Sequence, residues 1–114
     1  IITYTVTVVN TGSADATNVI LTDHLSDYTA WQIDYNTTDA TPDEPFSFSI
    51  GTSGLTQGVP DYSIDDGSNW GQAQASGNNA PAGYDGTITN WRIPMSGTMP
   101  VTESFTLRYK VLVK

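Results

Sequence analysis

The sequence contains no cysteine, one histidine and only four basic residues among its 114 residues. Without cysteine it can form neither disulfide bonds nor a thiolate metal site, so packing must stabilise the fold. It also lacks any run of about 18 apolar residues, so no membrane-spanning helix and no membrane insertion are expected. These absences predict a globular chain that relies on its apolar core.

The few basic residues are unevenly placed. The formal net charge is −8; all Lys and Arg follow residue 91, whereas eleven of the twelve acidic residues precede residue 92. An acidic chain repels phosphates, so we expect no nucleic-acid partner. Two interpretations of the asymmetry stay open: an acidic, soluble surface, or a domain whose basic end contacts the acidic end of a neighbouring copy.

Apolar residues alternate with polar ones at both ends of the chain. Ile2, Tyr4, Val6 and Val8 alternate with threonines, and the segment from Phe105 to Val113 has the same period. A period of two is typical of half-buried β-strands. We expect both segments to lie in the centres of their sheets, or to face each other across the core.

The chain between these segments consists of short apolar stretches separated by turns. No stretch keeps the spacing of an amphipathic helix, so no long helix is expected. Trp31 and Trp91 belong to the apolar faces of their stretches and are expected in the core. Residues 72–85 are predicted to form a long surface loop, and residues 94–100 a turn. About seven strands predict an all-β fold, an antiparallel two-sheet sandwich with one domain over residues 1–114.

One turn offers candidate metal ligands. The Asp65-Asp66-Gly67 sequence predicts a hairpin turn, and carboxylate oxygens in turns suit calcium. Asp65 and Asp66 are therefore the candidate calcium ligands, and no other cofactor is expected. The alternative is that these carboxylates accept backbone hydrogen bonds within the turn.

No arrangement of residues predicts catalysis. His24 is the only histidine and follows a strand-ending aspartate, so no nucleophile and base pair can be assigned. We therefore predict that the protein is not an enzyme. Trp70, just after the hairpin, is the one candidate platform for a glycan ligand. Asn36 begins an Asn-Thr-Thr acceptor for N-glycosylation; whether it is used stays open.

The segment from Tyr4 to Asp23 has the pattern Y-T-V-T-V-x-N-x-G-x-x-x-A-x-x-V-x-L-x-D. This pattern resembles the opening of a repeat domain of bacterial and archaeal cell surfaces, known as domain of unknown function eleven. Residues 62–70 resemble the central hairpin of that family, and residues 91–111 resemble its closing segment. The resemblance implies an immunoglobulin-like sandwich in secreted or surface-anchored proteins, with adjacent repeats as partners and no enzymatic activity.

The chain departs from that family at its beginning. Family members usually carry another strand before the Tyr-Thr-Val-Thr segment, whereas this chain starts at Ile1. If the chain is complete, one sheet has a vacant edge that could pair with a neighbouring copy. If the chain is a fragment, the missing strand lies in the longer protein.

The sequence thus predicts a structural module of the microbial cell surface, serving spacing, display or adhesion. The alternative is a subunit of an extracellular filament that polymerises by β-strand exchange. Filaments with a regular repeat in electron micrographs would favour the alternative, and discrete particles would favour the module.

Overall fold

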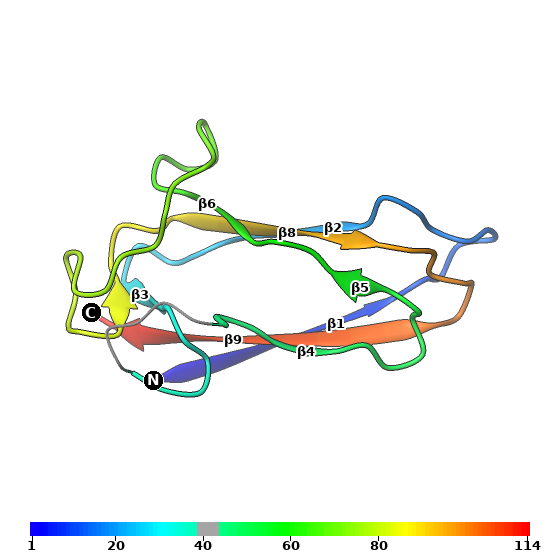
Figure 1. Ribbon diagram of the computed structural model, residues 1–114, viewed down its shortest axis with the longest axis horizontal. Coiled ribbons are helices and arrows are strands. Elements are labelled where there is room, and N and C mark those ends of the chain that lie inside the picture. The colour runs from blue at the N-terminus through cyan, green and yellow to red at the C-terminus, as the bar shows by residue number, and fades with distance from the viewer. Residues whose placement is uncertain (39–43) are drawn as a thin grey trace.

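The computed structural model describes residues 1–38 and 44–114 and confirms the expected fold class. Within these residues, nine β-strands form two antiparallel sheets that pack face to face (Figure 1). The first sheet contains β1 (Ile2–Val9), β3 (Thr29–Gln32), β4 (Ser47–Ser49), β7 (Tyr84–Asp85) and β9 (Ser104–Val113). The second contains β2 (Ile20–His24), β5 (Thr56–Gln57), β6 (Asp61–Ser63) and β8 (Asn90–Ser96). The described residues contain no helix.

β9 is the central strand of the first sheet. It pairs with β1 on one side, and with β4 and then β3 on the other. Its alternation is the one expected from the sequence, because the side chains of Phe105, Leu107, Tyr109 and Val111 are all buried. The order of the first sheet is β1-β9-β3-β7, and that of the second is β2-β8-β5, with β6 also on β8.

The expectation for the first strand was wrong in part. β1 does not lie in the centre of a sheet or across the core from β9; it is the edge strand beside β9. Val6 and Val8 pack partly against the core, but Ile2 and Tyr4 are each 39% exposed. An edge strand has a sheet neighbour on one side only. The apolar side chains at the beginning of β1, Ile2 and Tyr4, therefore stay partly in contact with water.

The turn expected at residues 94–100 begins later, because β8 continues through Pro94 to Ser96. On the β2 side the backbone hydrogen bond is made by Met95, whose N–H donates to the Val19 carbonyl. On the opposite side of β8, the Pro94 carbonyl accepts a hydrogen bond from the Gly58 N–H. Pro94 lies there between the part of β8 that pairs with β6 and the part that pairs with β5. A proline fits this position because no strand there requires its missing N–H.

The core is built around aromatic rings. Trp31 from β3 and Trp91 from β8 are both fully buried, as the sequence predicts. The Trp31 ring lies 5.4 Å from Phe46, 5.5 Å from Tyr109 and 6.4 Å from Trp91. Rings at these separations gain favourable edge and offset contacts in addition to their burial. Residues from both sheets therefore meet in one aromatic cluster, with no disulfide to support it.

Candidate functional site

The carboxylates expected to bind calcium lie in the loop after β6. Oδ1 of Asp65 accepts hydrogen bonds from the Ser63 hydroxyl and the Asn69 N–H, each at 2.8 Å, and Oδ2 accepts from the Asn69 side chain at 2.6 Å. These donors, Asn69 first, hold the pKa of Asp65 below its ordinary value. Asp66 and Gly67 follow with positive φ angles of 57° and 83°. The Asp65 carboxylate thus organises its own turn.

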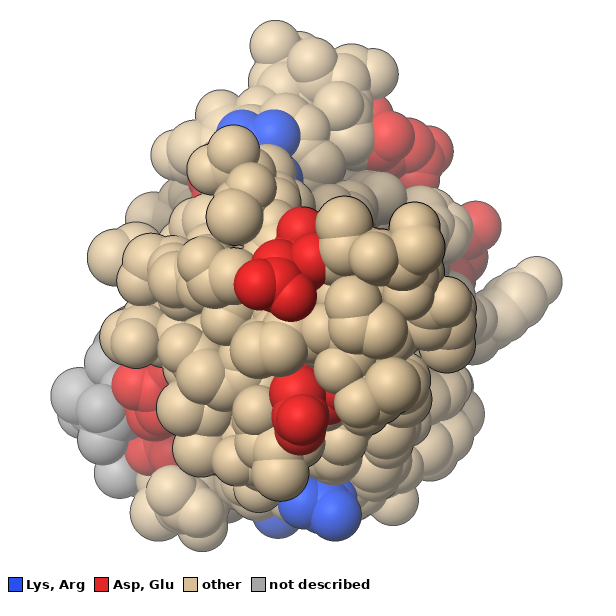
Figure 2. Space-filling model, turned by 90° about the vertical axis from the view of Figure 1, so that its right-hand side faces the viewer, with Lys and Arg blue, Asp and Glu red and all other residues tan. Residues whose placement is uncertain are grey.

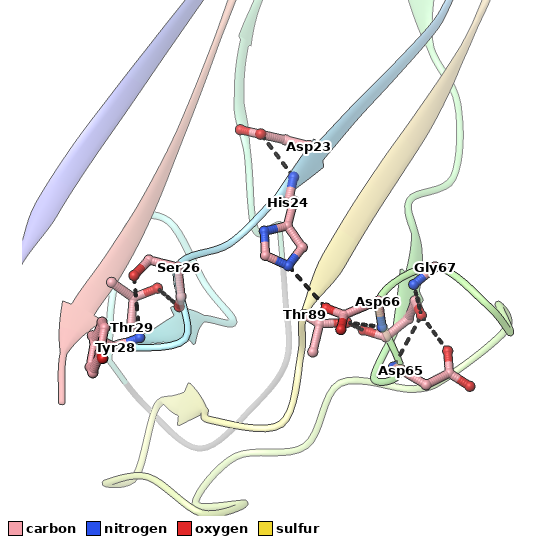
Figure 3. Close-up of polar contacts among 10 residues, drawn as sticks. Asp23, His24, Ser26, Tyr28, Thr29, Asp65, Asp66, Gly67 and Thr89 are labelled. Atoms are coloured by element: carbon pink, nitrogen blue, oxygen red, sulfur yellow. Dashed lines mark hydrogen bonds and ion pairs between the residues drawn. The ribbon is translucent and has the colours of Figure 1, made fainter.

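The Asp66 carboxylate points to a different partner. Its Oδ1 lies 3.0 Å from Nε2 of His24, at the end of β2, and its backbone N–H donates to the Thr89 hydroxyl (Figure 3). The His24 and Asp66 side chains are 53% and 72% exposed, so this contact contributes little to stability. In the described part of the chain, no group of three His, Cys, Asp or Glu could hold a metal ion. Calcium binding at Asp65 and Asp66 stays a prediction.

A cavity of about 340 Å³ lies beside His24, between the two edge strands β1 and β2. Its lining includes Tyr4, Asp23 and Tyr109, and the Tyr109 hydroxyl donates to Asp23 Oδ2 at 2.6 Å. Burial, and then the neighbouring Asp23 carboxylate, raise the pKa of Tyr109. The Asp23 carboxylate also accepts from the His24 N–H at 2.8 Å. The polar groups of this cavity therefore join β2 to β9.

A wider groove of about 590 Å³ lies over the second sheet, at Trp70 and Arg92. The Arg92 guanidinium lies 4.2 Å from the Trp70 ring centre and donates to Asp61 Oδ2 at 2.7 and 3.1 Å. One face of the Trp70 ring is therefore covered by a cation that is itself fixed by a carboxylate. Glycan binding at Trp70 stays a prediction, and a sugar ring would have to use the remaining ring surface.

Asp61 also attaches the loop that carries Trp70 to strand β6. Its Oδ1 accepts from the Gly71 N–H at 2.7 Å and from the Tyr62 N–H at 3.0 Å. Burial opposes ionisation of Asp61, but the hydrogen bonds from Arg92, Gly71 and Tyr62, together with the charge of Arg92, outweigh it and lower the pKa of this carboxyl. The Trp70, Arg92 and Asp61 side chains together clamp the loop onto the second sheet.

One structural carboxylate was missed by the sequence reasoning. Asp85 was assigned to a long surface loop, yet its side chain is fully buried in β7. Oδ1 accepts from the Thr87 N–H at 2.9 Å and the Thr87 hydroxyl, and Oδ2 accepts from the Ala75 N–H at 2.8 Å. An aspartate that precedes a glycine in a polar stretch is typical of an exposed turn, so no local signal predicted this burial.

The lowered pKa values predict a loss of stability in acid. Hydrogen bonds from Asn36 and Thr37 lower the pKa of Asp34, as those from Arg92 and Asn69 do for Asp61 and Asp65. A carboxyl whose pKa is lower in the folded than in the unfolded state stabilises the fold when the pH is above its unfolded pKa of 3.8. This contribution disappears as the pH falls through the folded pKa.

The midpoint temperature of thermal unfolding should therefore decrease as the pH is lowered from about 4 to about 2. Asp61→Asn should make this fall shallower, whereas Asp27→Asn, at an exposed position, should leave its slope unchanged. Differential scanning calorimetry across this pH range measures both variants. Identical slopes for wild type and Asp61→Asn would contradict the assignment of Asp61.

No family model, curated protein or solved structure matches this chain. Within residues 1–38 and 44–114, no helix is long and apolar enough to cross a bilayer.

Proposed function

We propose that this chain is a non-enzymatic structural module of the microbial cell exterior, serving display or adhesion. The observation that carries the proposal is that the aspartate carboxylates form hydrogen bonds within the fold. The side chains of Asp23, Asp34, Asp61, Asp65 and Asp85 all accept hydrogen bonds that fix turns or join strands. Carboxylates engaged in this way hold loops in place, which suits a module whose shape is its function.

The position of the chain ends favours display over end-to-end spacing. β1 and β9 are antiparallel neighbours, so Ile1 and Lys114 lie at the same end of the sandwich (Figure 1). Any chain attached to both ends would leave from that side. Figure 2 looks onto the opposite end, which is mostly uncharged, with isolated acidic patches and basic side chains toward its upper and lower margins. This far end is the surface that such a module would present.

The resemblance of residues 4–23 to a cell-surface repeat domain supports the extracellular setting. A test is labelling of intact cells of the source organism with antibodies raised against the purified chain. We expect labelling without permeabilisation, at a level unchanged by lysis. Labelling that appears only after lysis would contradict the proposal.

A second candidate, a filament subunit that exchanges β-strands, is favoured by β1. This strand carries no charge and no proline and lies at the edge of its sheet. If β1 left its own sheet, it could pair with β9 of a neighbour. Electron microscopy of the purified chain at high concentration tests this candidate. Regular filaments would support strand exchange, and discrete particles would contradict it.

A further inference from the structure

The outer side of β1, which we call the β1 edge, lacks the features that usually protect an edge strand. Proteins discourage edge pairing with short strands, charges, prolines, bulges or covering segments. β1 has eight residues, none charged and none proline. Its register with β9 is unbroken from Ile2 to Val9, so it contains no bulge. Among the described residues, only β9 pairs with it.

The hydrogen-bonding pattern shows which backbone groups of β1 face outward. The Asn10 N–H donates to the Glu103 carbonyl at 3.0 Å, so the backbone of Asn10 faces the β9 side. In antiparallel pairs this direction alternates, which turns the N–H and C=O groups of Thr3, Thr5 and Thr7 away from β9. The hydrogen bonding of Ser104, which lies opposite Val9, supports this assignment. The Ser104 carbonyl points away from β1, because it accepts from the Thr52 N–H on the other side of β9.

These outward groups are self-complementary. If two β1 edges meet antiparallel with Thr5 opposite Thr5, then Thr3 of each copy lies opposite Thr7 of the other. All of these are residues whose free N–H and C=O groups face the partner, so each pair can exchange two hydrogen bonds. On the other face of the sheet, Tyr4 lies opposite Val6 and Ile2 opposite Val8. The partly exposed Ile2 and Tyr4 side chains would gain apolar neighbours.

We infer that two copies of this chain associate through their β1 edges, in this register, to form one continuous sheet across a two-fold axis. The chain carries a net charge of −8, yet this edge is uncharged, so like charges do not face each other directly along it. The association differs from strand exchange, because β1 keeps its own place beside β9. It also stands apart from the proposed function, since it rests on β1 alone.

Cysteine cross-linking tests the register directly, because the chain has no cysteine of its own. In the inferred pair, the two Thr5 Cα atoms lie about 5.5 Å apart, within the range that a disulfide spans. Thr5→Cys should therefore form a covalent dimer under a mild oxidant such as diamide. Thr98→Cys, at an exposed loop position, should stay mostly monomeric at the same concentration.

A mixture of two variants fixes the register. Thr3→Cys mixed with Thr7→Cys should give the mixed dimer, whereas Thr3→Cys alone should not cross-link. Two Thr3 residues would be displaced by about 13 Å along the strands. If Thr5→Cys cross-links no faster than Thr98→Cys, or if Thr3→Cys alone cross-links as well as the mixture, the inference is wrong.

Sedimentation velocity of the unmodified chain gives an independent measurement. The wild type should show a concentration-dependent monomer–dimer equilibrium. Thr5→Lys places like charges opposite each other and should raise the dimer dissociation constant about tenfold or more, whereas Thr98→Lys should leave it unchanged. A wild type that stays monomeric at all concentrations, or equal effects of the two lysines, would overturn the inference.

Discussion

Replacing Trp31 with alanine is expected to lower the free energy of unfolding by about 3–5 kcal/mol. The Trp31 side chain is fully buried and contacts rings from both sheets, and its Nε1–H donates to Gln74 Oε1 at 2.8 Å. The substitution removes one of the two largest fully buried side chains of the core and leaves a cavity in its place. Because a domain of this kind has about 5–15 kcal/mol in total, much of its stability would be lost.

Urea unfolding followed by circular dichroism measures this effect. Trp70→Ala is the matched control, because it removes the same side chain from the outer surface, where it contacts Arg92. We expect the control to cost about 1 kcal/mol, the size of a surface cation–π contact. Equal losses for Trp31→Ala and Trp70→Ala would show that the aromatic cluster is not the stabilising core.

Asp85→Ala is expected to lower the free energy of unfolding by about 2–4 kcal/mol. The substitution removes the carboxylate that accepts from Ala75 and Thr87, and leaves their N–H groups without this partner inside the structure. Both hydrogen bonds are partly buried, and a hydrogen bond to a charged acceptor contributes more to stability than one between neutral groups. The segment that Asp85 ties down, residues 75–87, should also become sensitive to proteases.

Chemical denaturation and limited proteolysis with mass spectrometry of the fragments test the Asp85 prediction. Asp15→Ala, at an exposed position, removes the same charge from the surface and should change stability by less than about 0.5 kcal/mol. Wild-type protease resistance in Asp85→Ala would contradict the role assigned to this carboxylate.

The sequence predicted the buried strands well because their pattern reflects burial directly. Phe105, Leu107 and Tyr109 alternate in the sequence and are buried in β9, and the two central tryptophans are in the core. Within residues 1–38 and 44–114 the structure has nine strands, where the sequence predicted about seven. Among the nine are the two-residue strands β5 and β7, which are too short to show a period.

The pattern could not reveal which strand lies at an edge. Ile2 and Tyr4 alternate with threonines as clearly as the residues of β9 do, yet they are 39% exposed. A period of two reports only that one face of a strand is more apolar than the other. Which strands pair, and where a sheet ends, depends on contacts far apart in the sequence, such as Tyr4 stacked on Tyr109 with ring centres 5.1 Å apart.

In the candidate site, the features set by neighbouring residues were predicted from the sequence, and those set by contacts between distant residues were not. The turn at Asp65 and Asp66 followed from local chemistry, because the aspartates and Gly67 favour positive φ angles. The pairing of Asp61 with Arg92, across 31 positions, depends on β6 and β8 lying side by side. The burial of Asp85 likewise depends on β7 packing beside β3.

The most direct test of the whole account is amide hydrogen exchange in β1, measured by NMR at low and at high protein concentration. At low concentration we expect slow exchange for Tyr4, Val6 and Val8, whose N–H groups face β9, and fast exchange for Thr5 and Thr7. At high concentration Thr5 and Thr7 should become protected while the other three change little. Equal protection of all five amides at low concentration would contradict the placement of β1 at a free edge. Thr5 and Thr7 amides that stay fast at every concentration would contradict pairing through it.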